Sequence, residues 1–406
     1  MTSDQKTKHL FLVGDGMADY PISELGGKTP LEAAHTPNMD RIASCRIGRL
    51  KTIPEGMEPG SDVANLSLLG YDPGRYHTGR SPFEAASMGV NLRQDDMAFR
   101  MNLVTLNWGQ GGKIVMKSHS SGDITTPEAR CIVETLTDEL VIRDAVIYAG
   151  VAYRHLLVWK KGPENLLTIP PHDVLDQDMA SYLNGNGEDP IPGIIRSSWP
   201  LLKDHPVNIS RAERGLSAAN SIWLWGEGKA PTLPLFEKKY GLKGGVISAV
   251  DLLKGIGIYA GFCTIDVKGA TGYLDTNYLG KAESALKGLD ELDFVFVHVE
   301  APDEAGHNGS FKDKIKAIQD FDKKVVGTAL KGLALFDDYR IAVASDHFTP
   351  VIKKTHTSEP APFAWASKRE LGKAAKNRPF SEKEAVKSGL FFENGHEMID
   401  SFIGAS

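Results

Sequence analysis

The stretch "DFVFVHVEAPDEAGH", residues 293–307, predicts the fold of this chain. Its first half is a short apolar run, typical of a strand buried on both faces, and its second half is polar. The stretch "RIAVASDHFTP", residues 340–350, repeats the pattern as a strand followed by a polar loop. Between them, apolar side chains recur at helical spacing at Ile315, Ile318, Phe321, Val325, Val326 and Leu330. Strand, helix and strand in this order predict a parallel sheet in an α/β fold.

A third buried strand is expected in "HLFLVGDG", residues 9–16, where Asp15 follows the apolar run. Ligands of open α/β sheets bind at the carboxyl ends of the strands. All three strand ends carry candidate metal ligands: Asp15, Asp303, His307, Asp346 and His347, with His356 shortly after. Carboxylate and imidazole groups suit Mn²⁺, Zn²⁺, Co²⁺ or Mg²⁺, and the lack of thiolates among them disfavours a structural zinc. Six ligands and a serine are enough for two ions that share one nucleophile.

The candidate serine lies in "EGMEPGSDVANLSLLGYDPG", residues 55–74, where a Pro-Gly turn precedes Ser61 and a helix is expected to begin. One interpretation is structural, because serine is a good helix N-cap. The other is chemical, because a helix N-terminus stabilises an anion such as a phosphate on that serine. Coordination to a metal would also lower the pKa of the hydroxyl.

The length of 406 residues predicts two domains, or one domain with a large insertion. We expect residues 1–76 and 215–406 to form one discontinuous core, which "SIWLWG" at residues 221–226 helps to build. Short strands such as "HLLVW" and turn clusters such as "NGNGEDPIPG" predict a smaller α+β domain inserted at residues 77–214.

The composition narrows the possible partners and compartments. A net charge of −6 argues against binding to nucleic acid, and no apolar run is long enough to span a membrane. Cys45, Cys131 and Cys263 are far apart and form no CxxC pair. Together with the absence of a signal-peptide pattern, they favour the cytoplasm. The oligomeric state is not predicted.

Five motifs resemble, in order and over nearly the whole chain, a known family: "LVGDGMAD", "PGSDVANLSLLGYDP", "SPFEAASMGV", "VEAPDEAGH" and "SDHFTP…THTSEPAPF". The family is the archaeal-type, cofactor-independent phosphoglycerate mutases of the alkaline phosphatase superfamily. The resemblance implies an alkaline-phosphatase-like α/β core with a mostly parallel sheet flanked by helices, and an inserted substrate-binding domain. It also implies two divalent ions, with Mn²⁺ expected and Mg²⁺, Co²⁺ or Zn²⁺ as alternatives, and no need for 2,3-bisphosphoglycerate.

The resemblance also implies the role of each site residue. Ser61 is the expected nucleophile, phosphorylated during turnover, and it still caps its helix. Asp15, Asp346 and His347 are the expected ligands of the ion shared with Ser61, and Asp303, His307 and His356 those of the second ion. The implied substrate is a small phosphorylated three-carbon acid, and the implied reaction interconverts 3-phosphoglycerate and 2-phosphoglycerate.

Arginines bind phosphate and carboxylate in a bidentate fork, so the substrate should contact basic residues. The candidates are Arg154, Arg211, Arg214 and Lys268, and each of them has the alternative of being a solvated surface charge. One position departs from the family: relatives read "SAGHI" where this chain reads "SHSSGDIT". Asp123 stands in place of that histidine. It is a candidate general base, unless His119 supplies the missing imidazole.

Two other functions stay open at this point. The departure at Asp123 is compatible with a homoserine kinase-like phosphotransferase or a small-ester phosphatase of the same superfamily. The absence of a GxxxxGK[ST] loop weakens the kinase alternative. A non-catalytic protein that kept the fold is the third possibility, and the complete set of six ligands plus a serine argues against it.

Overall fold

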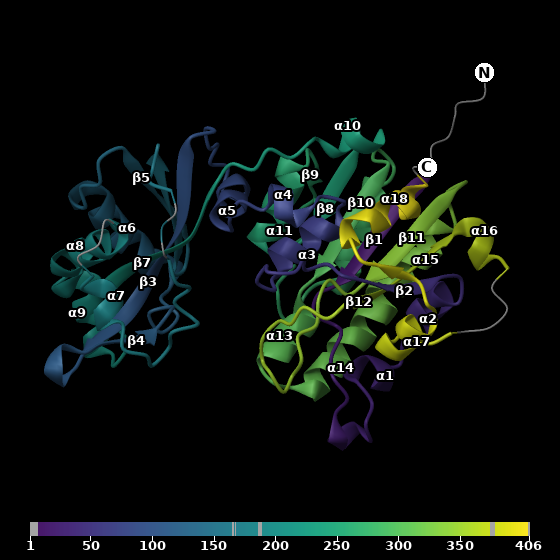
Figure 1. The fold of residues 1–406 in the computed structure, drawn as a ribbon, viewed down its shortest axis with the longest axis horizontal. Coiled ribbons are helices and arrows are strands. Elements are labelled where there is room, and N and C mark those ends of the chain that lie inside the picture. Colours follow the sequence, from purple (N-terminus) through teal and green to yellow (C-terminus); the bar gives the residue numbers. More distant parts are fainter. Residues whose placement is uncertain (1–6, 165, 167, 186–188, 374–377, 405–406) are drawn as a thin grey trace. The chain divides into compact units, whose positions relative to one another are not determined.

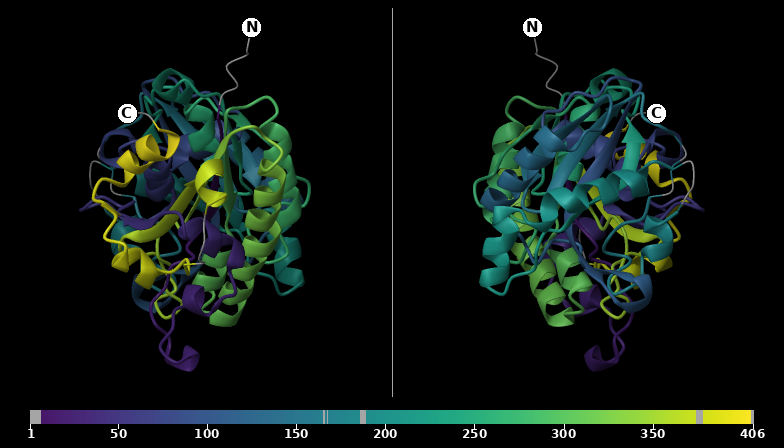
Figure 2. Two further views of the ribbon diagram at one scale, coloured as in Figure 1. Left: turned by 90° about the vertical axis from the view of Figure 1, so that its right-hand side faces the viewer. Right: turned by 90° about the vertical axis from the view of Figure 1, so that its left-hand side faces the viewer.

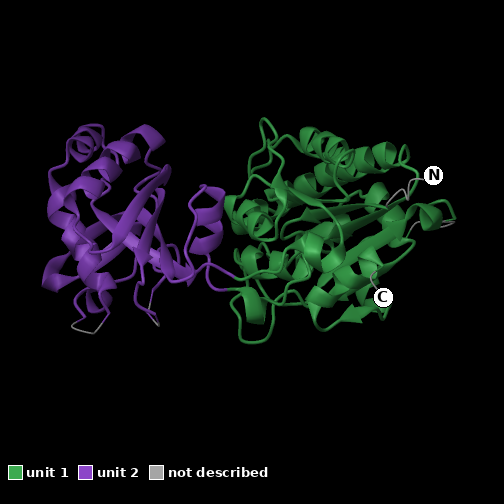
Figure 3. Ribbon diagram, turned by 90° about the horizontal axis from the view of Figure 1, so that it is seen from above, with its two compact units in different colours: residues 1–77, 232–406 green, residues 78–231 purple. Residues whose placement is uncertain are grey.

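The computed structural model describes residues 7–164, 166, 168–185, 189–373 and 378–404. Its contacts divide the chain into two compact units (Figure 3): unit 1 comprises residues 1–77 and 232–406, and unit 2 comprises residues 78–231. Unit 2 therefore begins one residue after the expected start and ends later than the expected residue 214. None of the described helices is long and apolar enough to cross a membrane.

Unit 1 is built on an eight-stranded sheet with the order β13-β2-β12-β11-β1-β10-β8-β9. β1 pairs in parallel with both β10 and β11, and only β12 runs antiparallel to its neighbours. The predicted α/β class with a mostly parallel sheet is therefore confirmed. The strands are β1 (Lys8–Gly14), β2 (Ile47–Leu50), β8 (Gly244–Ile247), β9 (Cys263–Thr264), β10 (Phe294–Val299), β11 (Tyr339–Ala344), β12 (Ala361–Ser367) and β13 (Phe391–Phe392).

Side chains of successive strand residues alternate between the two faces of this sheet. Leu10 and Leu12 of β1 belong to a large core with α2, α12, α14 and α15, which lie together on one face (Figures 1 and 2). Phe11, on the opposite face, contacts Phe402 of α18. The helices of unit 1 are α1 (Pro30–Ala33), α2 (Pro37–Ala43), α3 (Ser61–Leu68), α4 (Pro73–Tyr76), α10 (Phe236–Tyr240), α11 (Asp251–Tyr259), α12 (Tyr278–Gly288), α13 (Ala301–His307), α14 (Phe311–Asp320), α15 (Gly327–Leu333), α16 (Lys368–Leu371), α17 (Glu382–Lys387) and α18 (Met398–Ile403).

The predicted strand–helix–strand unit runs from β10 to β11, and both strands flank β1. The expected helix is α14 and α15 joined by a π-helical segment, Phe321–Val326. The residues after β10 differ from the prediction, since "APDEAGH" forms the short helix α13 rather than a loop. Pro302 occupies its first turn, where the missing N–H of proline breaks no helical hydrogen bond.

Unit 2 has its own five-stranded antiparallel sheet and its own apolar core. Its elements are α5 (Ser81–Ser87), β3 (Asp96–Trp108), β4 (Ile114–Ser118), α6 (Thr126–Glu139), β5 (Ala145–Val151), β6 (Arg154–Lys160), α7 (Ala180–Leu183), α8 (Ile191–Lys203), α9 (Pro206–Glu213) and β7 (Ser221–Lys229). The assignment of residues 221–226 to the larger core was wrong. They lie in β7, which pairs along β3, so the chain leaves unit 2 only after this strand.

Candidate metal centre

The carboxyl ends of β1, β10 and β11 bring the candidate ligands to one edge of the unit 1 sheet. In the register, Gly14 lies opposite Val299, and Val13 lies opposite Ala344. Asp15, Asp303 and Asp346 follow these strands directly or in the next turn. The loop after β11 returns through a bridge between Phe348 and Thr357, which carries His356 to the same edge.

Ser61 is the first residue of α3, and Gly60 occupies the N-cap position. The expectation that Ser61 caps this helix was wrong, since the N-cap residue is Gly60 and Ser61 already belongs to the helix. Its hydroxyl instead donates to Asp15 Oδ2 at 3.3 Å and lies 3.2 Å from His347 Nε2. The residue is buried, so its oxygen is aimed at the strand ends rather than at its own backbone.

The spacing of the first ligand set, Ser61, Asp15, Asp346 and His347, fits a bound cation. Four ligands at about 2.1 Å from a tetrahedral ion lie about 3.4 Å from one another. His347 Nε2 lies 3.2 Å from Ser61 Oγ, 3.2 Å from Asp15 Oδ1 and 3.6 Å from Asp346 Oδ2. Burial raises the pKa of Asp15 well above its usual range, and the neighbouring carboxylates of Asp346 and Asp303 raise it further. A cation between these carboxylates would relieve that repulsion.

The second ligand set, Asp303, His307 and His356, has the same spacing. The Nε2 atoms of His307 and His356 lie 3.0 Å apart, and they are 3.1 Å and 3.4 Å from the two oxygens of Asp303. On the far side of each ring, Nδ1 faces a carbonyl: Lys354 O at 3.0 Å for His307 and Pro59 O at 3.3 Å for His356. A carbonyl only accepts, so Nδ1 carries a proton, and Nε2 is the ring atom that would bind a metal once the ring is neutral.

His347 lies at the junction of the two sets. By distance alone, the ligand atoms of His347, Asp303 and His356 lie within 4.8 Å of one another. The ligand atoms of His298, Asp15 and Asp346 form a second group of the same kind. The 3.2 Å distances to Ser61 and Asp15 favour the division that the resemblance implies, because a protein hydroxyl is a ligand that the distance grouping leaves out.

Two site residues were missed from the sequence. His298 is fully buried, and its Nε2 lies 2.8 Å from Asp15 Oδ2 and 3.7 Å from Glu300 Oε2. Asn65 donates to both Ser61 O and Asp346 Oδ2 at 2.8 Å, which ties the start of α3 to the end of β11. His298 lies within an apolar strand, where nothing in the sequence marks it as a site residue. Asn65 lies one helical turn after Ser61, and this spacing could have predicted that it faces the site.

The structure places the four basic candidates in different surroundings. Arg211 is 1% exposed, and both it and the half-exposed Arg214 pair with Glu128, at 2.8 Å and 2.5 Å. Arg211 also donates to Ser217 O and Ser121 O. These contacts give Arg211 a structural role. Lys268 is exposed in unit 1, and its carbonyl accepts a hydrogen bond from Asn277.

Arg154 lies near two arginines that sequence reasoning missed. We call Arg80, Arg100 and Arg154 the arginine cluster. Arg100 is 8% exposed, pairs with Glu84 at 3.0 Å and stacks 4.4 Å above the ring of Trp225. Burial lowers the pKa of Arg100, and the charges of Arg80 and Arg154 lower it further while Glu84 opposes them. Among the described residues, Glu84 is the one carboxylate that forms an ion pair with these three guanidinium groups. The cluster therefore has an excess of positive charge, which an anionic ligand would offset.

Imidazoles border this cluster. The His172 ring lies 5.2 Å from Trp225 and 6.3 Å from His119. Burial lowers the pKa of His172 to about 4, and the charges of Arg80 and Arg100 contribute to this shift. Burial also lowers the pKa of His119, against the opposing charge of the exposed Asp123. Asp123 has a positive φ of 53°, and its backbone N–H donates to Ser120 Oγ.

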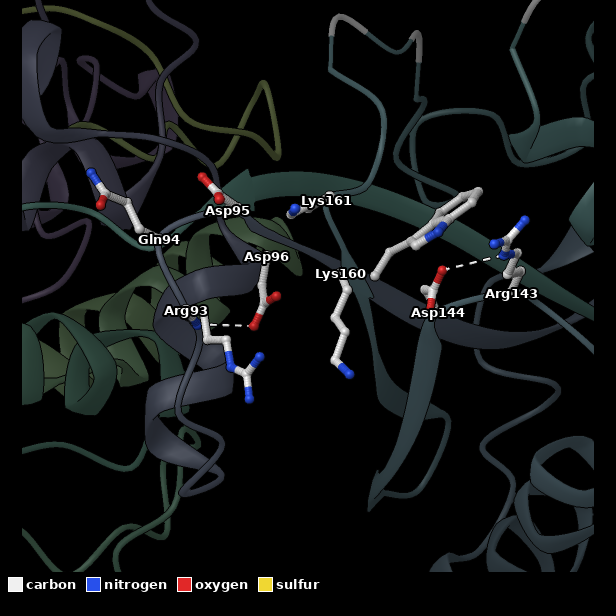
Figure 4. A pocket seen from close by; sticks show the side chains of 9 residues that line it. Arg93, Gln94, Asp95, Asp96, Arg143, Asp144, Lys160 and Lys161 are labelled. Carbon is white, nitrogen blue, oxygen red and sulfur yellow. Dashed lines mark hydrogen bonds and ion pairs between the residues drawn. The ribbon is translucent and has the colours of Figure 1, made fainter.

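A different cavity of unit 2, of about 840 Å³, contains none of the candidate residues. Figure 4 shows its charged lining, in which the Arg93 backbone N–H donates to Asp96 and Arg143 pairs with Asp144. The lining mixes basic and acidic side chains and includes none of the residues expected from the sequence, so we assign no role to this cavity.

Known proteins of one enzyme type resemble this chain closely. A family model described as 2,3-bisphosphoglycerate-independent phosphoglycerate mutase matches residues 43–208. A protein of Geobacter sulfurreducens, named as a probable enzyme of this type, is 48% identical over 98% of this chain and 99% of its own length. A Methanosarcina barkeri protein with the same enzyme name is 49% identical over 98% of this chain and 100% of its own.

Solved structures extend the match to the whole fold. A Pyrococcus horikoshii protein covers 99% of this chain and 98% of its own, with a TM-score of 0.80 and 31% identity. A cofactor-independent phosphoglycerate mutase of Thermoplasma acidophilum covers 98% and 99%, with a TM-score of 0.62 and 25% identity. Given identities near one half over almost the whole length, the chain belongs to the family of 2,3-bisphosphoglycerate-independent phosphoglycerate mutases.

Proposed function

We propose that this chain interconverts 3-phosphoglycerate and 2-phosphoglycerate by passing the phosphate through Ser61. The observation that carries the proposal is the buried Ser61 hydroxyl, held between Asp15 and His347 in a chain whose relatives are named as this enzyme. In this reaction the Ser61 oxygen attacks the substrate phosphorus, and the substrate oxygen leaves as glycerate. Glycerate then reorients, and its other hydroxyl takes the phosphate back from Ser61.

The chain's own residues prepare the Ser61 oxygen. The Ser61 hydroxyl donates to Asp15, and the Nε2 atom of His347 lies on its other side, so two groups fix its direction. Asn65 holds the backbone of Ser61 against Asp346. Asp15, Ser61, Asp346 and His347 would hold one divalent ion, and Asp303, His307 and His356 the other. Such ions lower the pKa of the serine hydroxyl and stabilise charge on the transferring oxygens. Mn²⁺ is the ion that we propose.

Substrate recognition belongs, in this proposal, to unit 2. The arginine cluster supplies excess positive charge suited to a carboxylate or phosphate, and Arg154 is the member predicted from the sequence. We propose Asp123 as the group that moves a proton to or from a glycerate hydroxyl, with His119 as its partner. We do not propose Arg211 and Arg214 as substrate ligands, because Glu128 already pairs with both guanidinium groups.

The relatives do not favour the homoserine kinase-like alternative or the small-ester phosphatase, since the Geobacter sulfurreducens and Methanosarcina barkeri proteins carry the mutase name. The reducing cytoplasm stays a prediction, supported by three free cysteines with no disulfide among the described residues.

The test is an enolase-coupled assay with 3-phosphoglycerate and Mn²⁺, without 2,3-bisphosphoglycerate. We expect turnover that chelation abolishes and Mn²⁺ or Co²⁺ restores. A parallel assay supplies homoserine and a nucleoside triphosphate and measures phosphohomoserine. Phosphohomoserine formation without mutase turnover would overturn the proposal, as would full mutase activity after exhaustive chelation.

A further inference from the structure

Thr349 lies between the two ligand sets of the candidate metal centre and contacts both. It is fully buried in the loop that follows β11. Its Oγ1 lies 2.5 Å from Asp303 Oδ1, in the second set, and 3.2 Å from His347 Nδ1, in the first. No other described side chain has a recorded hydrogen bond that joins His347 to Asp303.

The directions of these two hydrogen bonds follow from the chemistry of the groups. A threonine hydroxyl has one proton to donate and two lone pairs to accept. An ionised carboxylate only accepts, so the single proton of Thr349 goes to Asp303. The hydroxyl must then accept from His347, which places the proton of that imidazole on Nδ1. His347 Nε2 is left as a bare lone pair that faces Ser61 and Asp15, each at 3.2 Å.

The surroundings of Thr349 hold its hydroxyl in this position. The ammonium group of Lys314 is fully buried and donates to Thr349 O at 2.8 Å and to Ala18 O at 3.1 Å. It also pairs with Asp19 Oδ2 at 2.7 Å. Glycines pack against the threonine: a Cβ atom at Gly16 would collide with its Oγ1, and one at Gly306 would collide with its carbonyl oxygen. The side chain therefore has little room to rotate.

We propose that Thr349 is a positioning residue that couples the two metal sites, so that an ion at one site raises the affinity of the other. This inference rests on the proposed pair of ions. An ion bound by Asp303 keeps that carboxylate ionised and in place, so Thr349 continues to donate to it. His347 then keeps its proton on Nδ1 and offers Nε2 to the ion of the first ligand set, which it shares with Ser61. Without the hydroxyl, His347 Nδ1 would lose a buried partner, and the neutral ring could adopt the tautomer that cannot bind there.

The test compares Mn²⁺ binding to the metal-free full-length chain and two variants, by calorimetry and by electron paramagnetic resonance. Thr349→Val keeps the shape and removes the hydroxyl, whereas Thr349→Ser keeps the hydroxyl. The wild-type chain should bind two Mn²⁺ ions cooperatively. Thr349→Val should lose this cooperativity and bind the weaker ion about 10- to 100-fold less tightly. Thr349→Ser should restore both. Thr105→Val is the matched control, because it removes a buried hydroxyl bond, to Ala218 O, in unit 2.

A second measurement reads the protonation of His347 in the wild-type chain itself. Long-range ¹H–¹⁵N spectra of the metal-free wild-type chain, with the His347 signals assigned through His347→Gln, should show its proton on Nδ1. A proton on Nε2 overturns the inference. So does wild-type affinity and cooperativity in Thr349→Val, or independent binding of two ions to the wild-type chain. A wild-type chain that binds no Mn²⁺ contradicts the proposed function instead.

Discussion

The hydroxyl of Ser61 donates to Asp15 and caps no helix. Its removal should therefore abolish catalytic turnover and change the stability of the fold only slightly. Ser61→Ala should show only background turnover and form no phosphoenzyme with ³²P-labelled substrate. Its free energy of unfolding should change by about 1 kcal/mol or less, the value of one hydrogen bond. Ser67→Ala is the matched control on the same helix, since it also loses one hydroxyl bond, to Thr52 O. The control should keep full turnover. A phosphoenzyme in Ser61→Ala would rule out this nucleophile.

Asp123 should act on the second half of the reaction. If it moves a proton of glycerate, Asp123→Ala should still form phosphoenzyme, while transfer to glycerate slows by about 10²- to 10⁴-fold. The phosphoenzyme would then lose its phosphate to water. The measurement is the ratio of mutase to phosphatase turnover, with Asp123→His, which introduces the residue that the family resemblance implies, as the variant that should keep mutase activity. Unchanged mutase turnover in Asp123→Ala would show that this carboxylate takes no part.

His307 makes metal binding depend on pH. Burial alone would lower its pKa, but Asp303 at 3.1 Å outweighs burial and raises it from 6.5 to about 9 in the metal-free chain. The pair therefore stabilises the metal-free fold fully below about pH 6.5, and this stabilisation is lost as the pH rises through about 9. A metal needs the unprotonated ring, so Mn²⁺ affinity should instead rise with pH up to about 9.

Calorimetry in buffers of different ionisation enthalpy measures the protons that Mn²⁺ releases at pH 7. His307→Gln should release about one proton fewer than the wild-type chain. An equal release by both proteins would contradict the raised pKa.

At the scale of elements, the core strands were predictable and their packing partners were not. β1, β10 and β11 are buried on both faces, so each is a short apolar run that the sequence displays directly. The strand β7 is also a short apolar stretch, and its own residues do not show which of the two sheets it joins. Its pairing with β3 is a long-range choice, and the predicted domain boundary was misplaced for this reason.

The site shows the same division. Residues that follow a strand, such as Asp15 and Asp346, could be predicted because the carboxyl ends of parallel strands converge. His298 could not, since nothing in an apolar strand shows that one side chain faces Asp15. The arginines illustrate the opposite error: Arg211 was a substrate candidate because of its residue type, yet it is buried against Glu128.

Arg211 lies in α9 and links this helix to two other parts of unit 2. Its guanidinium group pairs with Glu128 of α6 and donates to the carbonyl of Ser121, in the loop before α6. Arg211→Met should lower the free energy of unfolding by about 3–5 kcal/mol, because Glu128 loses its buried partner. Arg214→Met removes the exposed partner of the same carboxylate and should cost less than about 1 kcal/mol. Denaturant titrations of both variants measure the difference. Equal, small effects would return Arg211 to the candidates for substrate binding.

At the scale of the whole molecule, every candidate metal ligand lies in unit 1, whereas unit 2 has a separate core. Five of the six tryptophans lie in unit 2: Trp108, Trp159, Trp199, Trp223 and Trp225. The sixth, Trp365, lies in unit 1. Tryptophan fluorescence of a Trp365→Phe variant therefore reports on unit 2 alone, while far-UV circular dichroism reports on both units.

Metal removal should therefore change the two signals differently. Each ion present at about 100 times its dissociation constant stabilises the unit that binds it by about 2.7 kcal/mol. Chelation should shift the unit 1 part of the circular dichroism transition to lower denaturant concentration. The fluorescence transition of Trp365→Phe should stay in place, because every ligand of the proposed sites belongs to unit 1. His307→Gln is the control, since loss of a ligand should reduce the shift caused by chelation. If the fluorescence transition moved together with the circular dichroism transition, the two units would unfold as one, and metal binding in unit 1 would stabilise unit 2 as well.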